Sequence, residues 1–355
     1  MDKSSQRKVL RVSPGCELPQ LARDITTALA GNGPTLGFGE VASEFATAQT
    51  AVVIGTSGTT GAPKEIMLSA HALLSSARAS NRFIGASPGD TWSLLLPLTH
   101  VAAVNVFVRA FELGTIPVDL RNHVGQYPRV DFTAIVPTQL FRALNGDDNL
   151  LKHLQGAKKV LVGGASLSAA VRNQAVAAGV NVVTTYGMSE TSGGCVYNGE
   201  VLEGVEVELR GGSIFIRGNV LALNLELNDG WFESNDLGEF IDDKLHVIGR
   251  SDDVIITGGE NLSLSNVEAL LNEHFPSIQT AAFSVDDPQW GQTLHIAVVG
   301  EVDSQSISSL LDTKIGSFAK PKGIHSLNSL PLLGIGKIDR KPRRESVSRH
   351  HCPVC

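Results

Sequence analysis

The sequence predicts an α/β protein with a large N-terminal domain, built of parallel βαβ layers plus a small antiparallel β subdomain, and a small mobile α+β C-terminal domain. Short apolar runs alternate with helix-like stretches from residue 51 to residue 186, which is typical of a parallel sheet covered by helices. Beyond residue 201 the apolar runs come in pairs around short turns, as in antiparallel hairpins. A length of 355 residues fits two domains, which we expect at residues 1–250 and 251–355.

The parallel layers are expected from apolar runs that have the length of strands. Residues 168–178 are predicted to form a helix, because Ser166 or Ser168 can cap its start and Gly179 follows its end. The runs predicted to be strands are residues 51–54, 94–96, 134–136, 159–162 and 180–184.

Hairpins and a compact α+β segment are expected next. Two pairs of apolar runs flank the dipeptides Gly211-Gly212 and Asp242-Asp243, which favour tight turns between antiparallel strands. Helix-like and strand-like segments then follow up to residue 315. The runs of the two hairpins are residues 205–209 with 213–216 and residues 239–241 with 245–248, and the later elements are helices 266–274 and 304–315 and strands 281–285 and 295–299.

The composition restricts the classes of function. A net charge of −7 argues against nucleic acid as the main partner. No apolar run approaches the ~18 residues of a membrane span, and the basic start lacks the apolar core of a secretory signal, so we expect no membrane insertion. Four cysteines without framework spacing fit a reducing cytosol, and we expect a cytoplasmic protein. The oligomeric state is left open, a homodimer included.

The most informative stretch is Thr-Ser-Gly-Thr-Thr-Gly-Ala-Pro-Lys at residues 56–64. Glycines let a backbone approach a ligand closely, successive N–H groups form a concavity that binds anions, and the hydroxyls and Lys64 add donors and charge. The pattern therefore predicts a loop that holds a polyphosphate. It is not the Walker pattern, because no Lys-Ser/Thr pair follows the glycines. A Ser/Gly-rich surface loop is the alternative interpretation.

Further glycine-rich and charged motifs follow in a fixed order: Tyr186-Gly187-Met188-Ser189-Glu190-Thr191, Asp236-Leu237-Gly238, Gly249-Arg250-Ser251-Asp252-Asp253 with Gly258-Gly259-Glu260-Asn261, and Gly334-Ile335-Gly336-Lys337-Ile338-Asp339-Arg340. With the opening loop, this ordered set resembles the adenylate-forming superfamily of acyl-CoA synthetases, luciferases and peptide-synthetase adenylation domains, over about residues 50–340. Residues 184–197 and the short total length look like the o-succinylbenzoate–CoA ligases of menaquinone-making bacteria.

The resemblance implies a site for ATP and Mg²⁺, with coenzyme A as the second substrate. Glu190 would bind Mg²⁺, Thr191 would contact the α-phosphate, and Lys337 would bridge that phosphate and the acid. Asp252 would be the hinge about which the small domain rotates. The residues implied in nucleotide binding are Thr56, Ser57, Gly58, Thr59, Thr60, Gly61, Lys64, Gly163, Gly164, Ala165, Tyr186, Gly187, Asp236 and Arg250.

The adenosine part of the nucleotide has its own expected contacts. Tyr186 would pack on adenine, and Gly163-Gly164-Ala165 would line the adenine pocket at the end of a predicted strand, where ligands bind in open α/β sheets. Asp236 would bind both ribose hydroxyls, because a carboxylate accepts two hydrogen bonds at once. Arg250 would contact the ribose as well.

The acid is expected to bind near residues 100–109. His100 matches the family histidine at the mouth of the acyl pocket. Arg109 lies in an otherwise apolar segment, where an arginine needs an anion, and Asn105 shares its face if the segment is helical. o-Succinylbenzoate has two carboxylates, so Arg109 would hold the one that is not activated; a salt bridge to Glu112 or another acid is the alternative. The other residues assigned to the acid site are Ser189, Ser192 and Gly193.

Four features depart from the family pattern or stand outside it. Glu65 replaces the glycine that usually follows the lysine, and Ala103 replaces the glycine of a common His-x-x-Gly. Ile256 stands where relatives often have lysine, close to the expected hinge. The C-terminal His350-His351-Cys352-Pro353-Val354-Cys355 has half the ligands of a zinc site but lacks a second cysteine pair, so we expect a disordered tail.

These observations predict a cytosolic acid–thiol ligase that activates o-succinylbenzoate with ATP, releases pyrophosphate, and then forms the coenzyme A thioester with release of AMP. The expected partners are these small molecules. One alternative is the same chemistry on another carboxylic acid or on a carrier protein. The other is a nucleotide-binding regulator without catalysis, against which Lys337 and Glu190 argue.

Overall fold

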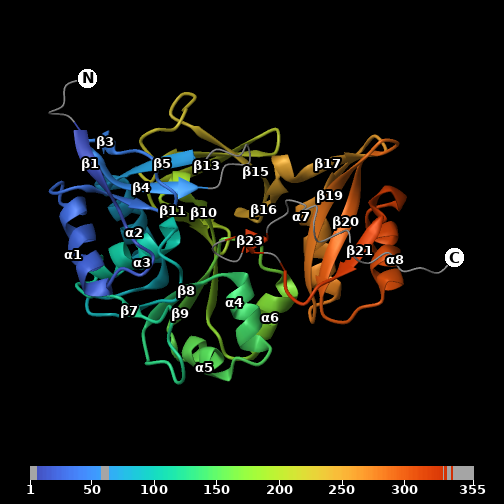
Figure 1. Cartoon of the computed structure of the whole chain (residues 1–355), viewed down its shortest axis with the longest axis horizontal. Helices are drawn as coiled ribbons and strands as arrows, with labels where there is room; N and C mark the ends of the chain where they lie inside the picture. The colour runs from blue at the N-terminus through green and yellow to red at the C-terminus, as the bar shows by residue number, and fades with distance from the viewer. Residues whose placement is uncertain (1–5, 57–63, 331, 334–336, 339–355) are drawn as a thin grey trace. The chain divides into compact units, whose positions relative to one another are not determined.

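The computed structural model describes residues 6–56, 64–330, 332–333 and 337–338. The chain divides into two compact units (Figure 1). Each unit has a hydrophobic core of its own. The first unit comprises Met1–Leu167, Val171–Ser234 and Gly238–Val247, and the second comprises Ser168–Ala170, Asn235–Leu237 and Ile248–Cys355.

The first unit begins with a five-stranded sheet in the order β3-β1-β2-β4-β5. Its three inner strands are parallel, and the two edge strands are antiparallel to their neighbours. Helix α1 (Leu18–Leu29) packs on this sheet through fully buried Leu21 and Ile25, which are four residues apart and share one helix face. The strands are β1 (Gln6–Arg11), β2 (Thr35–Phe38), β3 (Phe45–Thr47), β4 (Thr50–Thr56) and β5 (Lys64–Ser69).

A seven-stranded sheet in the order β12-β11-β10-β9-β8-β6-β7 forms the second layer. Its strands from β10 to β7 are parallel, whereas β11 and β12 are antiparallel additions. The predicted α/β class with parallel βαβ layers is confirmed. The strands are β6 (Trp92–Leu94), β7 (Val118–Asp119), β8 (Phe132–Ile135), β9 (Lys159–Val162), β10 (Val182–Met188), β11 (Gly193–Tyr197) and β12 (Glu200–Val201).

Helices accompany these strands along the chain. The strand predicted at residues 94–96 is instead Trp92–Leu94; Pro97, which lacks an N–H to donate to a ladder, follows shortly after its end. The helix predicted at residues 168–178 is observed as Ala169–Ala177. The helices are α2 (Ala70–Ile84), α3 (Val101–Glu112), α4 (Pro137–Leu144), α5 (Asp148–Gly156), α6 (Ala169–Ala177) and the 3₁₀ turn η2 (Ser189–Thr191).

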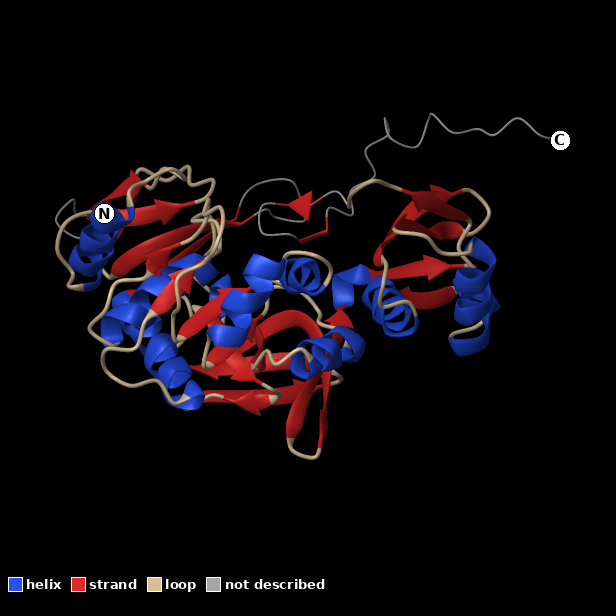
Figure 2. Cartoon of the chain, turned by 90° about the horizontal axis from the view of Figure 1, so that it is seen from below, coloured by secondary structure: helices blue, strands red, loops and turns tan. Residues whose placement is uncertain are grey.

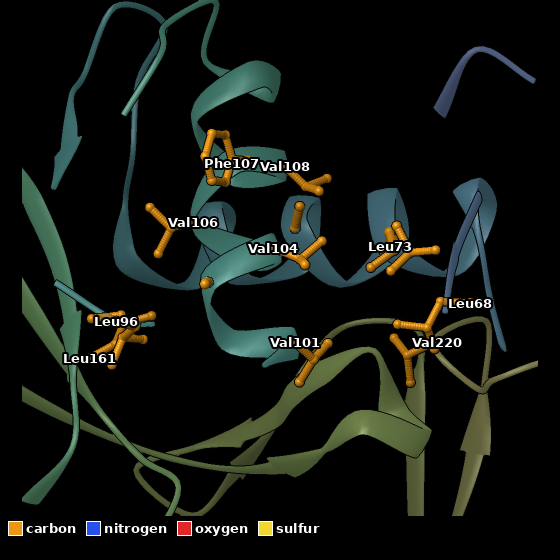
Figure 3. Close-up of a cluster of buried hydrophobic side chains, with 14 of the residues drawn as sticks. Leu68, Leu73, Leu96, Val101, Val104, Val106, Phe107, Val108, Leu161 and Val220 are labelled. Atoms are coloured by element: carbon orange, nitrogen blue, oxygen red, sulfur yellow. The ribbon is translucent and has the colours of Figure 1, made fainter. Parts of the chain in front are cut away.

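Helix α3 lies in the centre of the first unit's core. Apart from its last turn it is buried almost all round, as expected for a helix that is apolar on every face. Figure 3 shows Val104 and Val108 on the side that faces Leu73 of α2, and Val106 on the side that faces Leu96 and Leu161. This burial matters for function, because α3 also carries two polar side chains, which the same packing encloses.

The third sheet has four strands in the order β13-β14-β15-β16. Both predicted hairpins are present. Asp242 and Asp243 have φ values of 48° and 60°, the left-handed backbone that a two-residue type I′ turn requires. The strands are β13 (Val205–Arg210), β14 (Ser213–Gly218), β15 (Phe232–Ile241) and β16 (Lys244–Arg250).

The second unit contains a sheet in the order β18-β17-β20-β19, with β21 paired to β20. Figure 2 shows its two long helices beside these strands. Each helix buries a pair spaced by four residues, Val267 with Leu271 and Ile307 with Leu311. The elements are η3 (Ser251–Asp253), β17 (Val254–Thr257), β18 (Glu260–Ser263), α7 (Leu264–His274), β19 (Gln279–Asp287), β20 (Gly291–Val299), α8 (Ser304–Lys314), η4 (Ser317–Ala319), β21 (Gly323–Ser326), β22 (Leu332–Leu333) and β23 (Lys337–Ile338).

No helix within the described ranges combines the length and the apolar character needed to cross a bilayer.

Candidate active site

The base of the predicted phosphate loop is a hairpin between β4 and β5. Thr56 pairs with Lys64 in the ladder, and the Thr56 hydroxyl donates to the Lys64 carbonyl at 3.0 Å. The two ends of the glycine-rich segment are therefore fixed next to each other. Its middle, with Ser57, Gly58, Thr59, Thr60 and Gly61, lies outside the described residues.

Two of the predicted site residues, far apart in sequence, meet at this base. Lys64 Nζ lies 3.4 Å from Glu190 Oε1, although 126 residues separate them. Glu190 reaches this position because η2 follows directly after β10. The Lys64 side chain is 56% exposed, so the pair adds at most about 1 kcal/mol to stability. Its importance lies in bringing a cation and a carboxylate to the foot of the phosphate loop.

Glu65 directs its carboxylate toward residues 42–43. Its Oε1 accepts hydrogen bonds from the backbone N–H groups of Ala42 and Ser43, at 2.6 and 3.0 Å. Burial raises the pKa of Glu65, but the hydrogen bonds from Ser43 and Ala42 and the nearby Arg11 outweigh it and leave the pKa below its ordinary value. The departure from glycine at this position thus organises a neighbouring loop, since successive side chains of a strand point to opposite faces.

Close backbone packing fixes the end of β4 just before the phosphate loop. A Cβ atom on Gly55 would lie 2.1 Å from the Glu40 carbonyl oxygen. Gly39 has a φ of +77°, and a Cβ there would lie 3.0 Å from the Thr99 carbonyl oxygen. The segment that leads into His100 therefore lies beside the strand that leads into the phosphate loop. His100 itself is half-buried at the N-cap position of α3.

The turn after β10 is held by the hydroxyl of Thr191. Thr191 Oγ1 accepts from the Met188 N–H at 3.0 Å and donates to the Gly193 carbonyl at 2.7 Å. Thr191 is fully buried, so in this structure its hydroxyl closes the turn that presents Glu190. Its predicted contact with the α-phosphate stays a prediction. Ser189 lies half-buried in the same turn.

Helix α3 contacts the start of β11 through Asn105. Asn105 Nδ2 donates to the Ser192 carbonyl at 2.8 Å, and both residues are buried. Gly193 has a φ of +107°, and a Cβ there would lie only 2.0 Å from Asn105 Nδ2. A side chain at this position would have to displace Asn105. The structure thus brings together Asn105, Ser192 and Gly193, three residues that the sequence assigned to the acid site.

Arg109 follows one turn after Asn105 and is only 4% exposed. Its Nη2 donates to Tyr197 Oη at 2.9 Å, and its guanidinium carbon lies 5.3 Å from the centre of the Trp92 ring. The alternative partner Glu112 is occupied by Arg78, whose Nε lies 2.5 Å away. Within the described part of the chain, Arg109 forms no ion pair and its buried Nε has no hydrogen-bond partner. A buried arginine in such surroundings is suited to receive an anion.

The residues predicted around adenine lie at the carboxyl ends of β9 and β10. A Cβ atom on Gly163 would lie 2.1 Å from Thr185 Oγ1, so Gly163 passes close to β10, and Gly164 has a φ of +83°. Tyr186 is half-buried, and its hydroxyl donates to Ser234 Oγ at 3.5 Å. Gly187 also needs the absence of a side chain, because a Cβ there would lie 2.0 Å from the Gly193 carbonyl oxygen.

The remaining predicted residues belong to the second unit. Arg250 Nη1 lies 3.8 Å from Asp236 Oδ1, and the Asp236 side chain is mostly buried. Asp252 lies in η3, and Lys337 begins the short strand β23. Gly334, Ile335, Gly336, Asp339 and Arg340, and the C-terminal cysteine- and histidine-containing tail, lie outside the described residues.

Sequence reasoning missed a group of buried polar residues around Arg109. Tyr197 and Ser80 are fully buried and form a hydrogen bond of 2.8 Å. Asn81 Nδ2 donates to the Arg109 carbonyl at 3.0 Å. Ser80 and Asn81 fall on the buried face of α2, and this placement of polar residues on an apolar face is the signal that could have found them.

Comparisons with known proteins agree on one family. Residues 8–215 match the family described as AMP-binding enzyme, and residues 266–337 match its C-terminal domain. The chain is 37% identical over 319 residues to a protein of Mycobacterium tuberculosis named "Probable 2-succinylbenzoate--CoA ligase", covering 82% of each chain. It is 27% identical over 335 residues to the 2-succinylbenzoate–CoA ligase of Listeria monocytogenes, covering 85% of this chain and 71% of that one.

A solved structure shares the fold. The o-succinylbenzoate CoA synthetase of Bacillus subtilis, in complex with its acyl-adenylate intermediate, superposes with a TM-score of 0.71 at 21% identity. The match covers 94% of this chain and 82% of that one.

Proposed function

The chain belongs to the family of AMP-binding enzymes, and from that premise we propose that it is an ATP-dependent ligase that joins o-succinylbenzoate to coenzyme A. First, a carboxylate oxygen of the acid attacks the α-phosphorus of ATP, and the bond to pyrophosphate breaks. Then the sulfur of coenzyme A attacks the acyl carbon, AMP leaves, and the thiol proton passes to water. The thioester product belongs to menaquinone biosynthesis. The names of the relatives from two bacteria support this assignment.

The phosphate side of the site rests on the pair at the base of the β4–β5 hairpin. Phosphoryl chemistry is catalysed mainly by positioning and by neutralising charge. The loop from Thr56 to Lys64 would hold the phosphates, and Glu190 suits Mg²⁺, which nucleotide sites hold through one or two carboxylates and the phosphates. Bound there, the cation would offset phosphate charge. Lys64, 3.4 Å from Glu190, would then be available to the leaving pyrophosphate.

The adenosine side follows the sequence prediction. Tyr186 would stack on adenine beside Gly163-Gly164-Ala165, at the carboxyl ends of parallel strands where such folds bind ligands. Asp236 would accept hydrogen bonds from the ribose hydroxyls. Arg250, whose guanidinium lies 3.8 Å from the Asp236 carboxylate, would contact the ribose from the same side.

One observation carries the choice of acid: a buried arginine with hydroxyl and ring partners but, among the described residues, no acidic one. o-Succinylbenzoate brings two carboxylates, and only one is activated. The second would pair with Arg109, whose Nε is buried with no protein partner in the described ranges. Asn105, Ser192 and Gly193, packed one turn away, would form the wall of the same pocket, with Ser189 and His100 at its mouth.

The second unit would contribute to both steps. Lys337 would reach the α-phosphate in the first step, and rotation at Asp252 would replace it by the Gly258-Gly259-Glu260 turn for the thioester step. Hinges of this kind are a few residues that absorb a change of backbone dihedrals. ATP and coenzyme A are thus used in sequence at one site.

An acid panel in ATP–pyrophosphate exchange tests the proposal. o-Succinylbenzoate should support exchange, whereas benzoate, 4-phenyl-4-oxobutanoate and a fatty acid should support it far less, because each lacks one of the two carboxylates. Exchange supported best by a monocarboxylic acid would contradict the choice of acid but leave the ligase chemistry intact. No exchange with any acid would favour a nucleotide-binding protein without catalysis.

A further inference from the structure

Two hydroxyl groups from different elements form a hydrogen-bonded chain that leads to Arg109. Ser80 of α2 and Tyr197 of β11 are fully buried, and their hydroxyl oxygens lie 2.8 Å apart. Tyr197 Oη accepts a hydrogen bond from Arg109 Nη2 at 2.9 Å. Because this bond occupies the phenol oxygen as an acceptor, its own proton is best donated to Ser80 Oγ. The result is a chain of three side chains that ends on the guanidinium.

The ring of Tyr197 is held in place from more than one side. Phe83 of α2 contacts it edge-on, with ring centres 5.4 Å apart and planes at 83°. Gly194 lies so close that a Cβ atom there would be 2.6 Å from Tyr197 Cε1 and 3.2 Å from its hydroxyl. The phenol therefore has little freedom to turn, and its hydroxyl presents a fixed acceptor to Arg109.

A hydroxyl partner differs from a carboxylate partner in its effect on Arg109. A carboxylate would orient the guanidinium and also neutralise it, whereas a phenol only orients it. The face of Trp92, 5.3 Å from the guanidinium carbon, adds a second neutral support. Arg109 is thus fixed in direction while its positive charge stays available, and a buried charge of this kind favours an incoming anion strongly.

We infer that Tyr197, held by Ser80, is a positioning residue that directs the Arg109 guanidinium and thereby sets the preference of the enzyme for an acid with a second carboxylate. The inference rests on the proposed function. Tyr197 acts through Arg109 and takes no part in adenylation itself. Its loss should therefore affect recognition of the second carboxylate and leave the ATP site unchanged.

The test compares Tyr197→Phe with the wild type on o-succinylbenzoate and on 4-phenyl-4-oxobutanoate, which keeps the succinyl arm and lacks the benzoate carboxylate. Removing one hydrogen bond to a charged group should lower kcat/KM for the diacid on the order of tenfold, mainly through KM. The KM for ATP and the kcat/KM for the monoacid should change little. Ser80→Ala should lower kcat/KM for the diacid in the same direction with a smaller effect. It replaces Tyr197→Phe as the test if that variant does not fold. Tyr127→Phe removes a phenol hydroxyl from a half-buried tyrosine elsewhere and should match the wild type.

A double-mutant cycle with Arg109→Ala distinguishes positioning from a general structural role. In the Arg109→Ala background, Tyr197→Phe should have no further effect on the diacid-to-monoacid ratio. An equal loss of kcat/KM on both acids, or additive effects in the cycle, would overturn this inference but leave the proposed function intact. If the wild type itself does not turn over o-succinylbenzoate, the proposed function is wrong and the inference falls with it.

Discussion

At the scale of single residues, Arg109 is the residue that we propose selects the acid. Its burial at 4% exposure, together with neutral partners, is unusual, because arginines that deep in a protein are normally paired. The alternative from the sequence, a salt bridge to Glu112 or another acid, is not found among the described residues, where Glu112 pairs with Arg78. One arginine in a hydrophobic segment was enough to identify Arg109 from the sequence. It was not enough to identify the residues that contact it.

Arg109→Ala should raise the KM for o-succinylbenzoate and leave the KM for ATP almost unchanged. Truncating one partner of a desolvated charge pair costs roughly 2–5 kcal/mol, so kcat/KM should fall well over tenfold. Arg109→Lys should recover part of the loss, because it keeps the charge but not the planar fork. Steady-state kinetics with each substrate varied provides the measurement. An Arg109→Ala variant that keeps both its affinity for o-succinylbenzoate and its preference for the diacid would show that another residue binds the second carboxylate.

Gly193→Ala tests the wall of the acid pocket. The new Cβ would lie 2.0 Å from Asn105 Nδ2, at a φ of +107°, so Asn105 must move and lose its bond to the Ser192 carbonyl. We expect a loss of about 1–3 kcal/mol in the free energy of unfolding and a higher KM for the acid. Gly211→Ala, at a positive φ but with no atom within 4 Å of the new Cβ, is the matched control for backbone strain. Equal kinetic effects of the two substitutions would contradict this account of the wall.

At the scale of elements, the sequence was informative where local rules decide the structure. The bounds predicted for β9 are those observed, and the Asp242-Asp243 turn has the backbone that its residues favour. The apolar segment 101–112 is a helix with those bounds, α3. Contacts across long sequence distances could not be predicted: the Lys64–Glu190 pair and the Ser80–Tyr197 bond span 126 and 117 residues. Periodicity contains no information on such pairs.

The second unit contains a pH-sensitive pair between β20 and β21. His295 Nδ1 and His325 Nε2 lie 3.1 Å apart, and the rings stack at 15°. Burial lowers the pKa of both histidines, and His325 lowers that of His295 further. The unfolded chain therefore binds more protons than the folded one at mildly acid pH, so stability should fall as the pH drops through the ordinary histidine range near 6.5.

His325→Gln should reduce this pH dependence. The difference in urea midpoint between about pH 7.5 and about pH 5.5 should be smaller in the variant than in the wild type, because one of the two groups that resist protonation is gone. His71→Gln, at an exposed position of α2, should keep the wild-type difference. An unchanged pH dependence in His325→Gln would mean that the pair does not govern acid stability.

At the scale of the whole molecule, the second unit would contribute to both half-reactions, through Lys337 in the first and the Gly258-Gly259-Glu260 turn in the second. The α/β class, the antiparallel subdomain and the family were predictable, because ordered motifs and alternating elements identify them. The role of Thr191 in closing its own turn was not predictable. A threonine hydroxyl that could contact a phosphate could equally form a hydrogen bond to the backbone. The function of Glu65 in organising residues 42–43 was likewise visible only in three dimensions.

Lys337→Ala should separate the two half-reactions. If this lysine contacts the α-phosphate only during adenylation, ATP–pyrophosphate exchange should fall on the order of 100–1000-fold, the usual cost of one preorganised charge contact. Thioester formation from preformed o-succinylbenzoyl-adenylate should remain close to wild type. Single-turnover assays of each half-reaction measure both rates. An equal loss in the two would place Lys337 outside the adenylation step.

The most direct test of the central claim is product analysis with the full chain. Purified protein is incubated with ATP, Mg²⁺, coenzyme A and o-succinylbenzoate, and AMP, pyrophosphate and thioester are quantified together by chromatography and mass. The account predicts the three products in equal amounts. When an unreactive analogue replaces either the acid or coenzyme A, no AMP should accumulate beyond a first turnover. Formation of AMP without o-succinylbenzoyl-CoA, or no AMP above the acid-free background, would contradict it.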